Sequence, residues 1–101
     1  MMKLRINPLV AKDLKSIKDY IAEDNADKAL ETIQEICRQF ENIQQFPYIG
    51  VDLSKRVSFK TDYKYVVWRD YVVLYKVVKE AVEIYRVINR YQDITIVFGK
   101  N

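Results

Sequence analysis

The hydrophobic and polar positions of the chain change their spacing near its middle, from a helical period to one typical of strands. Apolar residues between positions 8 and 45 recur every three or four places, which predicts two amphipathic helices. Beyond position 60 the apolar residues are mostly Val, Ile, Tyr and Trp, in runs separated by two or three polar residues. Runs of this kind predict strands joined as hairpins, here over 63–68, 71–78 and 82–88.

The first helix is expected to follow a short alternating run, Lys3 to Ile6, which we interpret as an edge or first strand. Asn7 is a preferred N-cap residue, and Pro8 suits the first helical position because the N–H that it lacks would be unpaired there anyway. The predicted apolar stripe of this helix is Val10, Leu14, Ile17 and Ile21.

The second helix is expected to be capped at Asp24-Asn25 and to end before Pro47, which cannot continue a hydrogen-bonded helix. The connection between the helices is so short that they must form an antiparallel hairpin. A further strand is expected around Val57 to Lys60. The predicted apolar stripe of the second helix is Ala26, Ala29, Leu30, Ile33, Ile36, Cys37, Phe40 and Ile43.

These elements predict one α+β domain over residues 1–101: an N-terminal strand and an antiparallel helical hairpin packed on a twisted antiparallel sheet. The longest apolar runs are far shorter than the roughly 20 residues of a membrane helix, and no signal peptide is visible. Cys37 is the only cysteine, so a disulfide within the chain is impossible. We expect a cytoplasmic protein without a membrane partner.

The residue types that are missing exclude several classes of site. The sequence has no histidine, which excludes histidine acid–base catalysis, Ser-His-Asp systems and most zinc sites. With only two glycines, it can contain neither a P-loop nor a dinucleotide fingerprint. We therefore expect no metal and no cofactor, and a function that relies on cations, carboxylates, tyrosines, backbone and shape.

The net charge of +3 is unevenly divided between the two halves of the chain. Residues 1–50 carry seven Lys/Arg against eight Asp/Glu, a balance of −1, and residues 51–101 carry ten against six, a balance of +4. A basic sheet suggests contact with phosphate or with an acidic protein, although the surplus is small enough to serve solubility alone.

The cations of the last strand are the residues best suited to act on a phosphate. In a regular strand, Arg86, Ile88 and Arg90 would share one face. A charged Arg86 flanked by isoleucines needs solvent, a carboxylate partner such as Glu83 or Asp93, or a concave surface to line. The structural interpretation is an ion pair or simple exposure, and the functional one is contact with phosphate oxygens.

The carboxylates of the helical half show no paired arrangement of the kind that active sites use. They alternate with lysines and are expected to face solvent, some of them in ion pairs four residues apart: Asp13, Asp19, Glu23, Asp24 and Asp27.

Four short motifs follow one another along the chain. Each is a weak signal alone, but their order and spacing together are specific enough to identify a family. The first is Ile6-Asn7-Pro8 with Ala11, Asp13, Leu14, Ile17, Tyr20 and Ile21, and the second is Phe46-Pro47-x-x-Gly50. The third joins Tyr63-Lys64 to Tyr71-Val72-Val73-Leu74-Tyr75, and the last is Arg86-Val87-Ile88-Asn89-Arg90-Tyr91-Gln92-Asp93. Over nearly the whole chain this pattern resembles the RelE/ParE superfamily of toxins from type II toxin–antitoxin systems, in particular its ParE-like, plasmid-stabilisation branch.

The resemblance implies a toxin that arrests growth and a cognate antitoxin protein that wraps it in a hetero-oligomeric complex. Two targets stay open, because ParE-like members inhibit DNA gyrase whereas RelE-like members cleave mRNA at the ribosome without metal. We expect inhibition of DNA gyrase. The alternatives are a ribosome-dependent mRNA endoribonuclease and an antitoxin-binding module without toxicity.

If the protein is an endoribonuclease, the resemblance implies that Lys64, Arg86 and Arg90 stabilise the phosphate and the transition state, with Tyr91 as acid–base partner. Lys64 stands where the family usually has arginine, so a bidentate phosphate contact is lost. Asn89 stands where many relatives have histidine, so a proton donor or acceptor of suitable pKa is missing.

Overall fold

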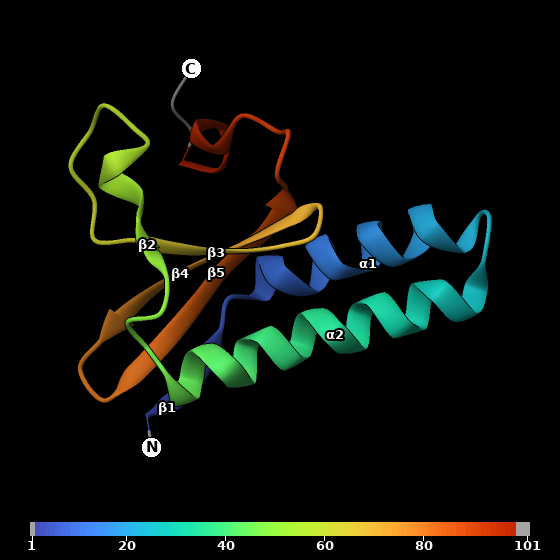
Figure 1. Cartoon of the computed structure of the whole chain (residues 1–101), viewed down its shortest axis with the longest axis horizontal. Coiled ribbons are helices and arrows are strands. Elements are labelled where there is room, and N and C mark those ends of the chain that lie inside the picture. Colours follow the sequence, from blue (N-terminus) through green and yellow to red (C-terminus); the bar gives the residue numbers. More distant parts are fainter. Residues whose placement is uncertain (1, 99–101) are drawn as a thin grey trace.

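The structure, a computed structural model, describes residues 2–98 and has the expected α+β architecture. A helical hairpin lies against one side of a five-stranded sheet, and the last described residues lie on the other side (Figure 1). In chain order the elements are β1 (Lys3–Ile6), α1 (Pro8–Ala22), α2 (Ala26–Gln45), β2 (Val51–Asp52), β3 (Lys64–Trp68), β4 (Tyr71–Val78) and β5 (Ala81–Asn89). Two 3-10 helices, η1 (Leu53–Lys55) and η2 (Ile94–Phe98), complete the described chain.

Both helices begin at the caps that the sequence predicts. Asn7 Oδ1 accepts a hydrogen bond from the Leu9 N–H at 2.9 Å, and Pro8 occupies the first turn of α1. Asn25 Oδ1 accepts from the Lys28 N–H, also at 2.9 Å. These bonds pair N–H groups that have no partner within the helix. Since only three residues separate α1 from α2, the helices lie antiparallel as expected.

The strand order is β1-β5-β4-β3-β2. The three long strands form the predicted meander, whereas β1 pairs with β5 in parallel, so the sheet is mixed at this edge. A parallel pairing requires a crossover connection, and the helical hairpin together with β2, β3 and β4 lies between β1 and β5 in the chain.

A β-bulge interrupts the regular alternation of β5. Leu74 of β4 lies opposite Arg86 while the next residue, Tyr75, lies opposite Ile84, which leaves Tyr85 as an extra residue. Beyond the bulge Ile88 and Arg90 line one cavity, whereas the Arg86 side chain departs from them and pairs with Asp13. Arg86 reaches α1, Ile88 packs in the core on the opposite face, and Arg90 follows the end of β5.

Each face of the sheet carries its own hydrophobic core. The helix-facing core contains Val10, Ile36, Phe40 and Ile43 of the helices against Val73, Tyr75, Val82, Ile84 and Val87. The second core, on the opposite face, is formed by Leu53, Tyr65, Val72, Leu74, Ile88 and Val97. Val97 belongs to η2, so the chain covers part of this second face with its own C-terminal segment.

Two details of the predicted elements are wrong. No strand forms over 57–60, where the chain turns after η1, and the edge strand is instead the two-residue β2. The apolar stripe of α2 is rotated, because Thr32 is buried whereas Leu30 and Cys37 are exposed. Thr32 can be buried because its hydroxyl donates to the Lys28 carbonyl at 2.8 Å.

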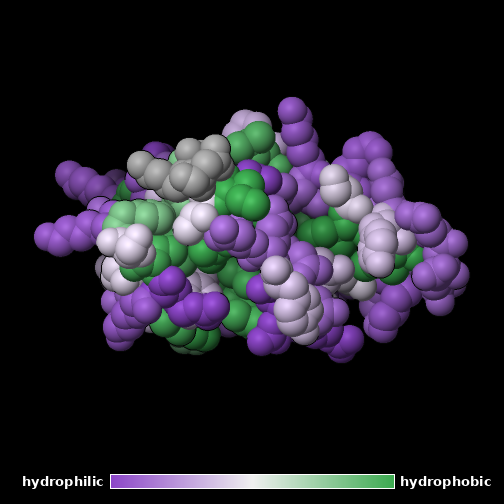
Figure 2. Space-filling view, turned by 90° about the horizontal axis from the view of Figure 1, so that it is seen from above, coloured by the Kyte–Doolittle hydropathy of each residue, from purple (hydrophilic) through white to green (hydrophobic). Residues whose placement is uncertain are grey.

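The surface differs between the sheet half and the helical half of the molecule. In Figure 2 the end that holds the turn between the helices is mostly hydrophilic, whereas hydrophobic residues show between hydrophilic ones over the sheet half. No helix of the described chain combines the length and apolar character that crossing a membrane requires.

Candidate functional site

Arg86 is held by a carboxylate that the sequence analysis placed in solvent. Its Nε and Nη2 atoms each donate to the Asp13 carboxylate at 2.8 Å, in the bidentate geometry typical of strong arginine–carboxylate pairs. The backbone N–H of Val87 donates to the same carboxylate at 2.9 Å. The two side chains are only 23% and 10% exposed. The expectation that Asp13 faces solvent is therefore wrong, and the carboxylate partner of Arg86 is Asp13 rather than Glu83 or Asp93.

The reason for this pairing lies in the edge of the sheet. β1 pairs with β5 only as far as Ile84. The next residue, Asn7, donates its N–H to the Ile84 carbonyl, and α1 begins directly after it. Within residues 2–98 no strand pairs with this edge of β5 beyond Ile84, and Asp13, on the second turn of α1, accepts a hydrogen bond from the Val87 N–H instead. The hydrogen bonds with Asp13 raise the pKa of the Arg86 guanidinium above its usual value.

Lys64 is likewise paired with a carboxylate. It lies directly opposite Asp52 in the β2–β3 ladder, and its Nζ is 2.6 Å from Asp52 Oδ1. The hydrogen bond from Lys64 lowers the pKa of the Asp52 carboxyl. The Lys64 ammonium also lies 5.6 Å from the centre of the Tyr48 ring, and the side chain is 17% exposed. Its contacts are those of a cross-strand ion pair at the sheet edge.

Arg90 and Tyr91 lie in the turn that follows β5. The backbone N–H of Arg90 donates to the Asp70 carbonyl at 2.8 Å, and its guanidinium donates to the Arg69 carbonyl at 3.2 Å. Tyr91 is 79% exposed, and its ring centre lies 5.7 Å from the Arg90 guanidinium carbon. An exposed tyrosine beside a single cation lacks the enclosed, strongly positive surroundings that a tyrosine base requires.

The four residues proposed for catalysis are not gathered at one cavity. Arg86 lines a cavity of about 430 Å³ between α1 and the end of β5, together with Asp13, Tyr20 and Tyr71. Arg90 lines an adjoining cavity of about 320 Å³ on the second face of the sheet, which shares Ile88, Asn89 and Gln92 with the first. Lys64 and Tyr91 line neither cavity. The roles assigned to these four residues remain predictions.

Two residues that line these cavities have positions that were not predicted from the sequence, Asp13 and Arg56. Asp13 had a usable signal: it lies three positions after Val10 and four before Ile17, and so on the apolar face of α1. A carboxylate on that face needs a buried partner. Arg56, which lines the 320 Å³ cavity with Arg90, had no comparable signal, because its position depends on the irregular segment between β2 and β3.

The described residues also limit the other chemistry available. Within residues 2–98 no group of three or more carboxylates or thiols is arranged to hold a metal ion. Tyr71, beside the Arg86 cavity, has a pKa raised by burial and by nearby Asp70, so it stays protonated near neutral pH. The Asp13–Arg86 cavity therefore combines a neutralised ion pair with tyrosine and amide side chains.

Comparisons with known proteins give a consistent result. A family model described as "ParE toxin of type II toxin-antitoxin system, parDE" matches residues 4–94. A solved structure titled "Chromosomal ParDE TA system from P. aeruginosa" superposes with a TM-score of 0.74 at 24% identity, covering 88% of this chain and 96% of that chain. Among curated protein sequences, no significant match was found.

Proposed function

Because the chain belongs to the ParE toxin family of type II toxin–antitoxin systems, we propose that it arrests growth by inhibiting DNA gyrase through a protein–protein contact. The observation that favours this target over mRNA is the pairing of Arg86 with Asp13. A guanidinium held by a largely buried carboxylate must break that pair before it can bind a phosphate, at a cost of several kcal/mol.

The other cations give no reason to prefer the nuclease. Lys64 is neutralised by Asp52, and the Arg90 guanidinium donates to the Arg69 carbonyl rather than lying beside Arg86. The phosphorane that forms during RNA cleavage would need these charges on one group of oxygens. A contact with a protein needs no such convergence, and it suits the exposed apolar residues on the helical hairpin, Tyr20 at 75% and Leu30 at 52% exposure.

A cognate antitoxin is the second expected partner, in a hetero-oligomeric complex that keeps the toxin inactive in the cytoplasm. The solved relative is described as a ParDE system, and this chain shares its fold. The surplus of positive charge in the second half of the chain favours an antitoxin that is acidic where it covers the sheet.

The gyrase proposal is tested with purified protein, gyrase, ATP and relaxed plasmid. We expect linear DNA to accumulate after detergent and protease treatment, because a poison traps the cleaved intermediate, and Tyr20→Ala to reduce the yield several-fold. Tyr48→Ala is the matched control, since Tyr48 is also 72% exposed but lies beyond the end of α2. Normal supercoiling without linear product, together with discrete cleavage of mRNA on ribosomes, would contradict the proposal.

A further inference from the structure

The outer side of β3 is only partly covered by its neighbour in the sheet. β2 pairs with β3 at Lys64 and Tyr65, and within residues 2–98 no strand pairs with this side of β3 beyond Tyr65. The uncovered residues are Val66, Val67 and Trp68, which we call the open edge. They carry no charge and no proline, the features that usually keep an exposed edge from pairing with another chain.

The backbone of Val67 faces this open side. Backbone groups point alternately to the two sides of a strand, and the Tyr63 carbonyl accepts a hydrogen bond from the Leu53 N–H on the β2 side at 2.9 Å. Val67, four positions after Tyr63, therefore directs its N–H and its carbonyl to the same side. Within residues 2–98 neither group has a hydrogen-bond partner there. They are a donor and an acceptor for one residue of an added strand.

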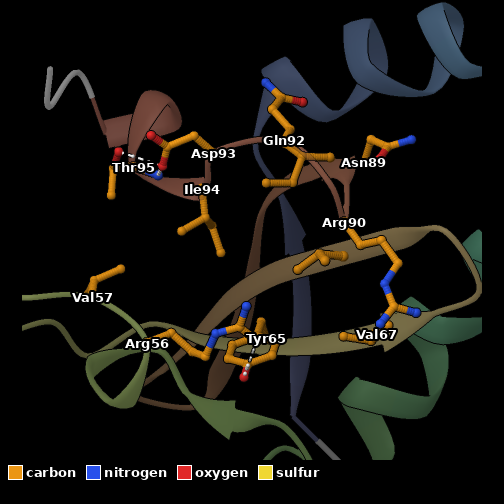
Figure 3. A pocket seen from close by; sticks show the side chains of 12 residues that line it. Arg56, Val57, Tyr65, Val67, Asn89, Arg90, Gln92, Asp93, Ile94 and Thr95 are labelled. Atoms are coloured by element: carbon orange, nitrogen blue, oxygen red, sulfur yellow. Dashed lines mark hydrogen bonds between the residues drawn. The ribbon is translucent and has the colours of Figure 1, made fainter.

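A row of apolar side chains runs from the open edge across the second face of the sheet. Val67 lies opposite Val72 of β4, and Val72 lies opposite Ile88 of β5. All three line the 320 Å³ cavity, with Ile94 on another wall (Figure 3). Val67 is 43% exposed, so the row ends in solvent. A long apolar side chain on a residue opposite Val67 would continue the row and pack over the cavity.

Arginine side chains lie on the same face of the sheet. In Figure 3 the guanidinium of Arg90 lies near Val67, and Arg56 ends beside Tyr65, where its Nη1 donates to the hydroxyl at 3.2 Å. The Arg90 Nη1 donates to the Arg69 carbonyl, also at 3.2 Å. Among residues 2–98 the ion pairs include none of these three arginines. Their guanidinium groups keep donors for a carboxylate.

Charge decides which chain fits the open edge. The charged residues around it are three arginines and two carboxylates, a balance of +1: Arg56, Arg69, Arg90, Asp70 and Asp93. A second copy that paired through the same edge would bring like arginines together, which is unfavourable. An acidic segment would be complementary to them. The antitoxin is the partner expected to be acidic where it covers the sheet.

We propose that an extended acidic segment of the antitoxin adds to the open edge as a short antiparallel strand. Its central residue exchanges two backbone hydrogen bonds with Val67 and packs an apolar side chain over the cavity. A carboxylate two positions along, on the same face, binds Arg90. The inference rests on the antitoxin partner of the proposed function, and it adds the place and the residue pattern of that contact.

The test is fluorescence anisotropy with a labelled nine-residue peptide, titrated with the full chain. The peptide is Gly-Ser-Glu-Val-Leu-Val-Glu-Ser-Gly, blocked at both ends, so that its leucine and both glutamates share one face of a strand. We expect a Kd below about 1 mM. The same peptide with lysines in place of the glutamates should bind at least several-fold more weakly. Weaker binding than about 1 mM by the acidic peptide, or equal binding of both, would overturn the proposal.

N-methylated peptides test for strand pairing itself. Methylation of the leucine nitrogen removes the N–H that faces Val67 and should lower affinity roughly tenfold. The matched control is methylation of the following valine, whose N–H points away from the sheet, and it should keep the affinity. An equal effect of the two methyl groups would contradict strand addition, because the peptide would then bind through its side chains alone.

Variants of the protein locate the contact. Val67→Asp places a carboxylate beside the acidic segment and should lower affinity roughly tenfold, and Arg90→Gln should lower it several-fold. The matched control is Ile6→Asp, on the edge strand β1 at the other side of the sheet, where Ile6 is 49% exposed. It should keep the affinity, and far-UV circular dichroism should show that all three variants are folded. Equal losses in Val67→Asp and Ile6→Asp would overturn the proposal.

Two further measurements identify the occupant. Val67→Asp should trap linear DNA with gyrase as the unchanged chain does, because the proposed gyrase contact lies on the helical hairpin. Loss of linear DNA with folded Val67→Asp, or a dimer of the chain in analytical ultracentrifugation that Val67→Asp abolishes, would overturn the antitoxin as the occupant. If the unchanged chain traps no linear DNA, the gyrase proposal alone fails, and the peptide titrations still decide this one.

Discussion

Asp13 joins the two layers of the molecule through a single carboxylate. It accepts three hydrogen bonds, two from Arg86 and one from the Val87 backbone, where β5 has lost its neighbour β1. An unpaired N–H at a covered sheet edge and an unpaired guanidinium would each be costly. One side chain on α1 satisfies both, which fixes the helix against the last strand.

Replacing Asp13 with alanine should therefore destabilise the fold strongly. We expect a loss of about 3 kcal/mol in the free energy of unfolding, because Arg86 and the Val87 N–H lose their partner while largely shielded from water. Urea denaturation at neutral pH measures this loss in unfolding free energy. The control is Asp19→Ala. Asp19 pairs with the exposed Lys15, and losing this pair should cost at most about 1 kcal/mol of unfolding free energy. Equal losses would contradict the role assigned to Asp13.

The need of Arg86 for a partner can be predicted from its isoleucine neighbours, but the identity of that partner cannot. Asp13 lies 73 residues away in the sequence, so the pair depends on the way α1 crosses the edge of β5. The bulge at Tyr85 also shifts the register of β5 just before Arg86, and strand alternation alone does not predict a bulge.

The connection between α2 and β2 is held against the sheet by two hydrogen bonds to the Tyr75 hydroxyl. The Tyr75 hydroxyl of β4 accepts from the Gly50 N–H at 2.9 Å and donates to the Pro47 carbonyl at 2.8 Å. A Cβ atom at Gly50 would lie 2.6 Å from that hydroxyl and 2.9 Å from the Tyr65 carbonyl. The Phe46-Pro47-x-x-Gly50 motif thus has a physical reason: a side chain at position 50 would push this connection off β4.

This contact predicts a loss of stability at high pH. Burial raises the pKa of Tyr75, and an ionised hydroxyl could no longer donate to Pro47. Because the pKa in the folded state is raised, the contribution of Tyr75 to the unfolding free energy should be constant below about pH 10 and fall above it, as the unfolded chain releases the proton first. Urea denaturation from pH 7 to 11 measures the fall.

The variant Tyr75→Phe isolates the contribution of this hydroxyl. It should cost about 1–3 kcal/mol at pH 7, since Gly50 N–H and the Pro47 carbonyl lose their partner, and it should reduce the fall above pH 10. Tyr48→Phe, at an exposed position, should alter neither quantity. An unchanged fall in Tyr75→Phe would show that other tyrosines are responsible.

At the level of elements, caps and periodicity predict both helices and the three long strands. Asn7 and Asn25 act locally on their own helices, so their effect can be read from neighbouring residues. The segment from 51 to 63 has no such local signal. Its two-residue strand forms because Val51 and Asp52 meet Tyr65 and Lys64, residues that are distant in sequence.

At the scale of the whole molecule, the cations of the sheet half divide into two groups. Lys64 and Arg86 are bound by carboxylates and stabilise the fold, whereas Arg56 and Arg90 surround the cavity on the second face. The composition predicts the surplus charge but not this division, which depends on the partner that each cation meets. The helical hairpin, with its exposed apolar residues, lies on the opposite side of the sheet.

The inhibition of gyrase is tested most directly in a bacterium that expresses the chain without an antitoxin. Thymidine and leucine incorporation are followed together from the moment of induction. We predict that DNA synthesis stops first and that a DNA-damage response follows, while leucine incorporation continues through the first interval. An immediate stop in leucine incorporation with cleaved mRNA would contradict gyrase as the target, and undisturbed growth with folded protein present would contradict toxicity itself.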